Sequence, residues 1–64
     1  MILNTLKKHR KVRGWTQKTL AEKTGLGQST ISEIEKGTHI PSLEDAFLLA
    51  EIFGVPLEEL FQHV

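Results

Sequence analysis

The sequence predicts an all-α fold in a single domain of residues 1–64, arranged as a compact bundle of five helices. Apolar residues recur at the three- and four-residue spacing of amphipathic helices. Glycines stand where four of these helical segments would end, and helix-capping residues stand where others would begin. No segment shows the alternation of apolar and polar residues that is typical of a strand. We therefore expect no sheet.

The first helix is predicted over residues 2–13 and ends at a glycine. Ile2, Leu6 and Arg10 follow one another at intervals of four, so they share the inner face of this helix. A charged side chain in that position needs a partner, because burial removes its hydration. The other basic residues of the helix form either a solvated face or contacts to phosphate, and Lys11 is the candidate for such a contact.

Two further helices are predicted over residues 17–24 and 28–36, on either side of a turn at Gly25. Thr16 has a hydroxyl that can cap the free N–H groups of the first helix. Gly25 accepts the left-handed conformation that commonly closes a helix. Trp15, just ahead of this pair, is expected to pack in the core, with stacking on DNA as the alternative.

The helix over residues 28–36 has a polar outward face. At 100° per residue, Ile31 and Ile34 fall together on its inner side. The opposite arc carries amide, hydroxyl, carboxylate and amine groups: Gln28, Ser29, Ser32, Glu33 and Lys36. Gln28 can donate and accept together, which matches the major-groove edge of adenine. Glu33 either accepts from cytosine or lies at the rim of such a contact.

A fourth helix is predicted from the capping residue Ser42 to about Phe53, and a short fifth helix begins at Pro56. A helical wheel turns five apolar residues of the fourth helix inward: Leu43, Ala46, Leu49, Ala50 and Phe53. In the fifth helix, Leu57 and Leu60 return to the core.

Two apolar residues of the fourth helix, Leu48 and Ile52, fall near its opposite, acidic side. Two exposed apolar residues mean little by themselves. Together with Phe61 and Val64 from the last segment, they are expected to form one exposed patch. We interpret this patch as a two-fold dimer interface.

The charges are segregated along the chain, although the net charge is zero. Residues 1–36 hold all eight Lys and Arg residues against three acids, which gives this part a charge of +5, and residues 37–64 hold five acids with no Lys or Arg, which gives −5. Such a dipolar molecule would turn its basic half, with the paired helices, towards phosphates.

The composition excludes several classes of protein. There is no cysteine, so disulfides and thiolate metal sites are absent. No apolar run approaches the ~20 residues that span a bilayer, and we expect a soluble, cytoplasmic protein with no membrane partner. The three histidines lie in different elements without ligand spacing, and no catalytic constellation is present. We therefore predict a non-enzyme without metal, cofactor or small-molecule substrate.

The pattern of small, apolar and glycine positions resembles the lambda repressor and Cro type of helix-turn-helix regulators, the Xre family. The resemblance covers residues 6–61 and rests on Gln17, Leu20, Ala21, Gly25, Leu26, Gln28 to Ser32, Ile34 to Gly37, Pro41 to Leu43 and Ala50. The sequence departs from the family at Trp15, where Leu is commoner, and at Leu48 and Ile52, where polar or small residues are usual.

The resemblance implies a lambda-repressor-like domain whose helix-turn-helix consists of the second and third helices. It implies base reading by the outward face of the third helix, at Gln28, Ser29, Ser32 and Glu33. It also implies phosphate contacts near both helices, for which the candidates are Thr16, Gln17, Lys36, Thr38, His39 and Lys11. For His39 a solvated loop position is the alternative. Finally, it implies a half-buried ion pair between Arg10 and Glu35.

The function predicted from these observations is a sequence-specific regulator of transcription that binds double-stranded DNA. We expect a homodimeric repressor that reads a palindromic operator through the major groove. The alternative is an antitoxin-like or adaptor module that uses the same fold to bind another protein, such as a toxin. A third possibility is that these residues are the N-terminal part of a longer regulator.

Overall fold

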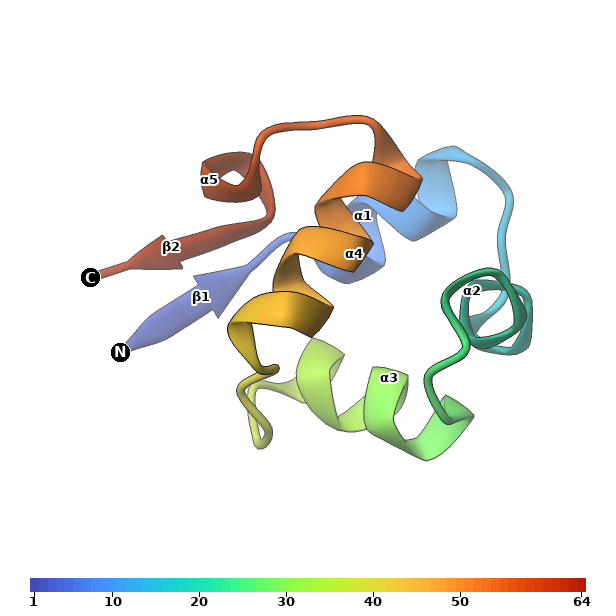
Figure 1. The fold of residues 1–64 in the computed structure, drawn as a ribbon. Helices are drawn as coiled ribbons and strands as arrows, with labels where there is room; N and C mark the ends of the chain where they lie inside the picture. The colour runs from blue at the N-terminus through green and yellow to red at the C-terminus, as the bar shows by residue number, and fades with distance from the viewer.

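Five helices and one two-stranded antiparallel sheet form the fold in the computed structural model, which describes residues 1–64 (Figure 1). In chain order they are β1 (Ile2–Asn4), α1 (Leu6–Val12), α2 (Gln17–Thr24), α3 (Gln28–Lys36), α4 (Leu43–Phe53), α5 (Leu57–Leu60) and β2 (Phe61–His63). The predicted five-helix class is thus confirmed. The expectation of no sheet is wrong.

The ends of the helices follow the capping signals in the sequence. The Thr16 hydroxyl accepts a hydrogen bond from the N–H of Thr19 at 3.0 Å, and the Ser42 hydroxyl accepts one from the N–H of Asp45 at 3.2 Å. Gly25 has a φ of +78° at the end of α2, which a residue with a side chain adopts only at a cost. This turn sets the direction in which the chain enters α3.

All five helices contribute to one hydrophobic core. The fully buried side chains come from every helix: Leu6, Leu20, Ile31, Ile34, Leu49 and Leu60. Ala50 and Phe53 complete the cluster from α4. Trp15 is half-buried and packs against this cluster, with its ring stacked on Phe53 at a centroid distance of 5.4 Å. Core packing of Trp15 is therefore what the structure shows.

The first predicted helix is wrong over residues 2–4, because these residues form β1. The strand pairs with β2 from the other end of the sequence, and Leu3 lies opposite Gln62. α1 starts only after Asn4, whose side-chain oxygen accepts from the N–H of Leu6 at 3.2 Å. The Asn4 amide also donates to the carbonyl of Ile34 at 2.9 Å. One side chain thus begins α1 and holds β1 against the end of α3.

The inward face of α4 differs from the helical wheel at three positions. Leu43, predicted inside, is 68% exposed. Leu48 and Ile52, predicted outside, are half-buried, and Ile52 packs against the core. The reason is that α4 contacts both α2 and α5, so two flanks of the helix are covered instead of one. The α4 end near Leu43 extends beyond the short α5.

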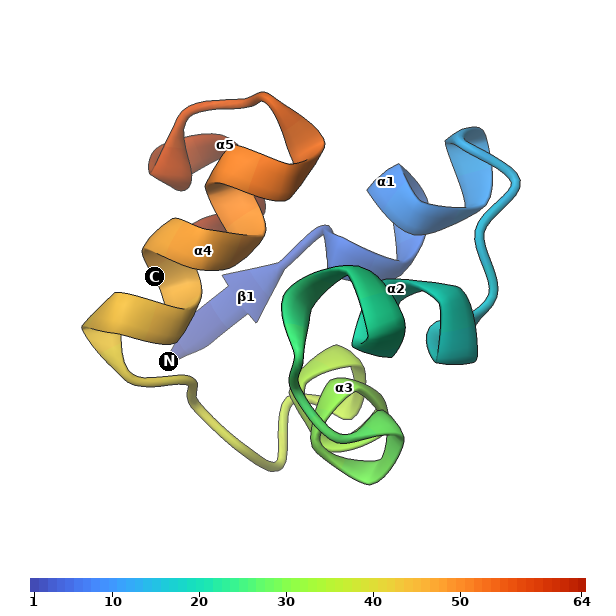
Figure 2. The ribbon, with the colours of Figure 1, turned by 45° about the vertical axis from the view of Figure 1, so that its right-hand side comes forward.

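The arrangement leaves α3 along one side of the molecule. Figure 1 shows α3 at the bottom, with α2 beside its beginning and the two strands at the opposite end of the view. In Figure 2, α3 is seen nearly end-on below α2, so the two helices cross steeply. None of the helices combines the length and apolar character needed to cross a bilayer.

Replacement of Asn4 by Ala tests the link between β1, α1 and α3. Asn4→Ala leaves the Leu6 N–H without its partner and removes one of the two donors to the Ile34 carbonyl, which keeps its hydrogen bond from the Gly37 N–H. We therefore expect a loss of about 1–3 kcal/mol of unfolding free energy. Urea unfolding followed by circular dichroism measures it. Gln62→Ala is the matched control, since Gln62 lies in the same sheet but is exposed and its side chain makes no hydrogen bond. Equal effects of the two substitutions would contradict the assigned role.

Candidate nucleic-acid interface

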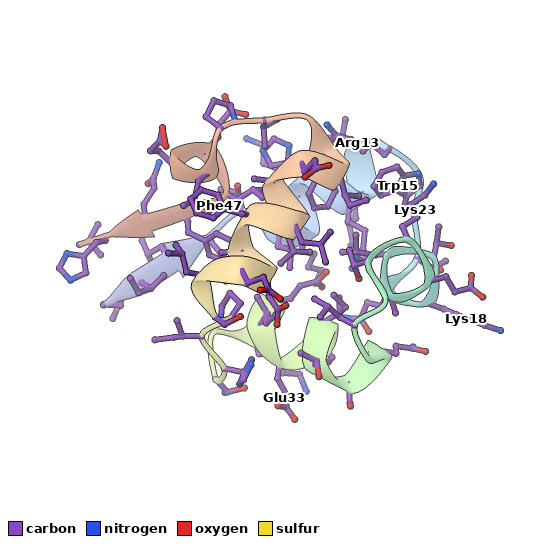
Figure 3. All side chains as sticks on the ribbon, in the orientation of Figure 1. Arg13, Trp15, Lys18, Lys23, Glu33 and Phe47 are labelled. Atoms are coloured by element: carbon purple, nitrogen blue, oxygen red, sulfur yellow. The ribbon has the colours of Figure 1, made fainter.

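The outer face of α3 is polar and open to solvent. Gln28, Ser29, Glu33 and Lys36 are exposed, and Ser32 is half-buried. Figure 3 shows Glu33 pointing away from the body of the protein. On the inner side, Ile31 and Ile34 are buried in the core. The structure thus brings the predicted base-reading residues together on one surface, and the buried isoleucines hold that surface in a fixed orientation.

The beginning of α2 lies beside this surface. Thr16 is exposed, but its hydroxyl is already used in capping α2 and in a 2.9 Å contact with the Thr19 hydroxyl. Gln17 is half-buried, and its amide donates to a Glu35 carboxylate oxygen at 3.1 Å. The free N–H groups of the first turn of α2 carry partial positive charge, which favours an anion there.

Arg10 and Glu35 form an ion pair between α1 and α3. The Arg10 Nε donates to Glu35 Oε2 at 2.7 Å, and Nη2 donates to Oε1 at 3.0 Å. The third nitrogen, Nη1, donates to the carbonyl of Trp15 at 2.9 Å. The two side chains are only 9% and 4% exposed, respectively. A bidentate pair of this kind is geometrically specific as well as strong.

Glu35 connects three helices through its carboxylate. It accepts from Arg10 of α1 and from Gln17 of α2, and it belongs to α3 itself. Burial alone would raise the pKa of the Glu35 carboxyl. The hydrogen bonds from Arg10 and Gln17 and the positive charges of Arg10 and Lys7 outweigh that effect and hold the pKa below its usual value. The hydrogen bond to Glu35 likewise raises the pKa of Arg10. Both groups are therefore charged at neutral pH.

The loop after α3 carries the remaining candidates. Lys36, Thr38 and His39 are all exposed. Thr38 closes α3, because its N–H donates to the Glu33 carbonyl at 3.0 Å and its hydroxyl donates to the same oxygen at 3.2 Å. Lys11 is exposed on α1.

Two basic residues with clear positions were missed by the sequence reasoning. Lys18 is exposed in the first turn of α2, and Figure 3 shows it extending away from the body. The sequence could have indicated Lys18 as a candidate for phosphate contact, because it directly follows Gln17, which is one. Arg13 is structural: it donates to the carbonyls of Phe53 at 2.6 Å and His9 at 3.0 Å and lies over the Phe53 ring at 4.9 Å. No side-chain pattern reveals a partner that is a backbone carbonyl.

A second basic and aromatic cluster lies away from α3. Figure 3 places Arg13, Trp15 and Lys23 together at the α1 and α2 end of the molecule. The Lys23 amine lies 4.8 Å from the centre of the Trp15 ring, a distance at which cation–π attraction operates. No group of three His, Asp or Glu side chains could hold a metal ion.

Comparison with known proteins identifies the family. The helix-turn-helix family profile matches residues 6–60. The chain belongs to the lambda repressor-like helix-turn-helix family. A helix-turn-helix-type transcriptional regulator of Methanocaldococcus jannaschii is 47% identical over 58 residues, which cover 91% of this chain and 88% of the relative.

Solved helix-turn-helix proteins share the fold. The restriction-modification controller protein C.AhdI of Aeromonas hydrophila has a TM-score of 0.78 and 31% identity, over 84% of this chain and 82% of its own. The biofilm regulator SinR of Bacillus subtilis, solved in complex with DNA, has a TM-score of 0.76 and 30% identity, over 83% of this chain and 86% of its own. SinR has also been solved in a complex with the SinI protein.

These comparisons confirm two of the predictions. The family is the one that the sequence resembles, and its members are DNA-binding regulators of transcription. The prediction that the chain is not an enzyme is confirmed on the same ground.

The Glu35 carboxylate gives the stability of this helix-turn-helix a defined pH dependence. Its pKa is lower in the folded chain than the ordinary value of 4.5. The ion pair therefore stabilises the fold fully above that value and is lost as the pH falls through the folded pKa. Removing one partner of a buried pair costs about 3–5 kcal/mol. We expect Glu35→Gln to lose this amount near neutral pH, and the difference from the wild type to shrink below pH 4.5.

Thermal unfolding between neutral and acidic pH measures this difference. Glu33→Gln is the matched control, because Glu33 is exposed on the same helix and surface substitutions usually change stability by less than about 0.5 kcal/mol. A Glu35→Gln deficit that stays constant as the pH falls would show that the lost charge is not the cause.

Proposed function

We propose that the chain is a sequence-specific regulator of transcription that binds double-stranded DNA with α3 in the major groove. The observation that carries this proposal is the division of α3 into a buried apolar side and an open polar side. On its inner side, α3 is held in place by the ion pair between Arg10 and Glu35 and by the hydrogen bond from Gln17 to Glu35. A rigid polar helix that stands clear of the body has the dimensions that the major groove admits.

Base reading is assigned to Gln28, Ser29, Ser32 and Glu33. Gln28 is exposed at the beginning of α3, the end of a recognition helix that contacts base edges in this class of protein. Its amide matches the donor and acceptor of adenine. Glu33, exposed five residues further on, accepts from cytosine or disfavours sites that bring a phosphate too close.

Phosphate contacts are assigned to groups on both sides of α3. On the α2 side they are the first-turn N–H groups, Gln17, Thr16 and, from its position, Lys18. On the other side they are Lys36, Thr38 and His39, and Lys11 of α1 is a further candidate. The Nε2 of Gln17 has two N–H groups and uses one on Glu35, so the other can reach a phosphate. The charge of +5 on residues 1–36 adds long-range attraction.

We further propose that the chain acts as a homodimeric repressor on a palindromic operator. Two α3 helices related by a two-fold axis would enter adjacent major grooves about 34 Å apart. The chain offers no ligand-sensing pocket on the DNA side, so repression by occupying the operator is the simplest mode of action.

Selection from random duplex DNA at about 0.15 M salt tests this function directly, since at lower salt non-specific attraction would mask any preference. An enriched two-fold motif with half-sites one helical turn apart is the expected result. Absence of any motif, with weak and steeply salt-dependent binding, would contradict sequence-specific regulation.

Gln28→Ala and Lys36→Ala separate base reading from phosphate contact. Both residues are exposed, so neither change should disturb the fold. Gln28→Ala should relax the preference at one base position by about 1–3 kcal/mol, whereas Lys36→Ala should weaken binding to all sequences and lower the salt slope by about 1. Fluorescence anisotropy with operator and single-base variants measures both. A uniform loss for Gln28→Ala would remove it from the base-reading set.

A second candidate function is a protein-interaction module, such as an antitoxin or adaptor. Two observations favour it: SinR, a similar protein, forms a complex with SinI, and residues 37–64 of this chain carry only negative charge among Asp, Glu, Lys and Arg. A neighbouring gene for a small toxin, together with failure of the DNA selection, would support this function over the first.

A further inference from the structure

The first turn of α1 lies against the last turn of α3. Asn4 fixes this arrangement, because its side chain accepts from the N–H of Leu6 in α1 and donates to the carbonyl of Ile34 in α3. In Figure 2, the beginning of α1 is seen above the end of α3. Side chains from the first turn of α1 therefore share a surface with those from the end of α3.

Lys7 lies on the flank of α1 that is next to α3. At about 100° per residue, it stands about 60° around the helix from Arg10, which bonds to Glu35 of α3. It stands about 160° from His9, whose ring packs beside that of Phe53 in α4. The charge of Lys7 accordingly acts on the Glu35 carboxyl, whose pKa it helps to lower.

The charge of Lys7 is not neutralised within the protein. Both oxygens of Glu35 already accept hydrogen bonds, Oε2 from Arg10 and Oε1 from Arg10 and Gln17. Lys7 is exposed, and neither of the two ion pairs of the protein includes it. Because Arg10 already balances Glu35, the amine of Lys7 leaves a positive charge in excess beside α3.

A second unpaired lysine stands near the same place. Lys36 follows Glu35 directly and lies about 100° further around α3, towards the open face. It is exposed and belongs to neither ion pair. Lys7 from α1 and Lys36 from α3 thus border the neutral pair of Arg10 and Glu35 with two free amines, an arrangement that attracts an anion.

We propose that Lys7 is a further DNA-binding residue, which contacts a backbone phosphate on the side of α3 where Lys36 lies. This inference rests on the proposed binding of duplex DNA and adds α1 to the elements that hold the duplex. A phosphodiester suits the site, because a lysine amine binds phosphate as a mobile point charge with three donors. Such a contact fixes the orientation of the protein on the duplex and carries no sequence information directly.

The alternative role of Lys7 is structural. A positive charge near the end of α3 would stabilise the negative end of the helix dipole and the Glu35 carboxylate. Two observations make this effect small: Lys7 is exposed, where water and salt screen its charge, and Glu35 already has a bidentate partner in Arg10. A structural role would change the thermal unfolding midpoint, whereas a phosphate contact changes the salt dependence of DNA binding.

Lys7→Ala and Lys8→Ala form a matched pair of variants. The two lysines are exposed neighbours on α1, and each substitution removes one positive charge. Lys8, however, stands about 160° around the helix from Arg10, on the side away from α3. If Lys7→Ala lowers the thermal unfolding midpoint, Lys7→Gln, which keeps most of the aliphatic stem, takes its place.

Fluorescence anisotropy over a salt series measures the contact, with a labelled duplex of mixed sequence about two helical turns long as the probe. Lys7→Ala should lower the slope of log K against log salt by about 1, because one phosphate contact is lost. Lys8→Ala should keep a slope close to that of the wild type. Lys7→Arg should also keep it, since a guanidinium binds phosphate as well.

The outcomes separate this contact from the proposed regulatory function. Equal slopes for Lys7→Ala and Lys8→Ala, with a wild-type chain that binds the duplex, overturn the contact and leave DNA binding in place. A lower unfolding midpoint with an unchanged slope for the Lys7 variants assigns them the structural role and also overturns it. A wild-type chain that binds no duplex at low salt overturns DNA binding itself. A lower slope for Lys7→Ala alone supports the contact even if selection yields no motif.

Discussion

The buried ion pair between Arg10 and Glu35 is the interaction on which the helix-turn-helix depends. Burial removes most of the hydration of both charges, so each is stabilised chiefly by the other, with further hydrogen bonds from Arg10 to the Trp15 carbonyl and from Gln17 to Glu35. The two hydrogen bonds from Arg10 to Glu35 hold α1 against α3, and Gln17 joins α2 to the same carboxylate. The orientation of α3, and with it the direction of the side chains proposed to read bases, is therefore set from inside the protein.

The two sides of α3 differ in role: the inner side stabilises the fold, and the outer side is the one proposed to bind DNA. Ile31 and Ile34 face the core, and Glu35 lies between the core and the surface, where it touches α1 and α2. The polar residues on the outer side are held by no tertiary contact of their own. Substitutions at these exposed positions should therefore have little effect on folding.

Local features of the sequence predict more of this structure than distant ones. The caps at Thr16 and Ser42 and the turn at Gly25 act within a few residues, so α2, α3 and α4 could be located. β1 and β2 have three residues each, too few to show a period, and their pairing joins opposite ends of the sequence. For α4, a helical wheel gives the directions of Leu43 and Ile52 around the helix axis. It does not show which neighbouring helix covers each of them. The partner of Arg10 came from the family resemblance.

The pairing of β1 with β2 also links the two ends of the sequence to the end of α3. Leu3 and Gln62 pair across nearly the whole chain, so this contact encloses the largest loop in the fold and carries the highest closure entropy. Asn4 ends β1 and donates from its amide to the Ile34 carbonyl at 2.9 Å, whereas the ion pair of Arg10 and Glu35 joins α1 to α3 across a shorter stretch of the chain. Separation of the two strands would therefore remove a contact at the end of α3, so residues at the two ends of the sequence influence the helix in its middle.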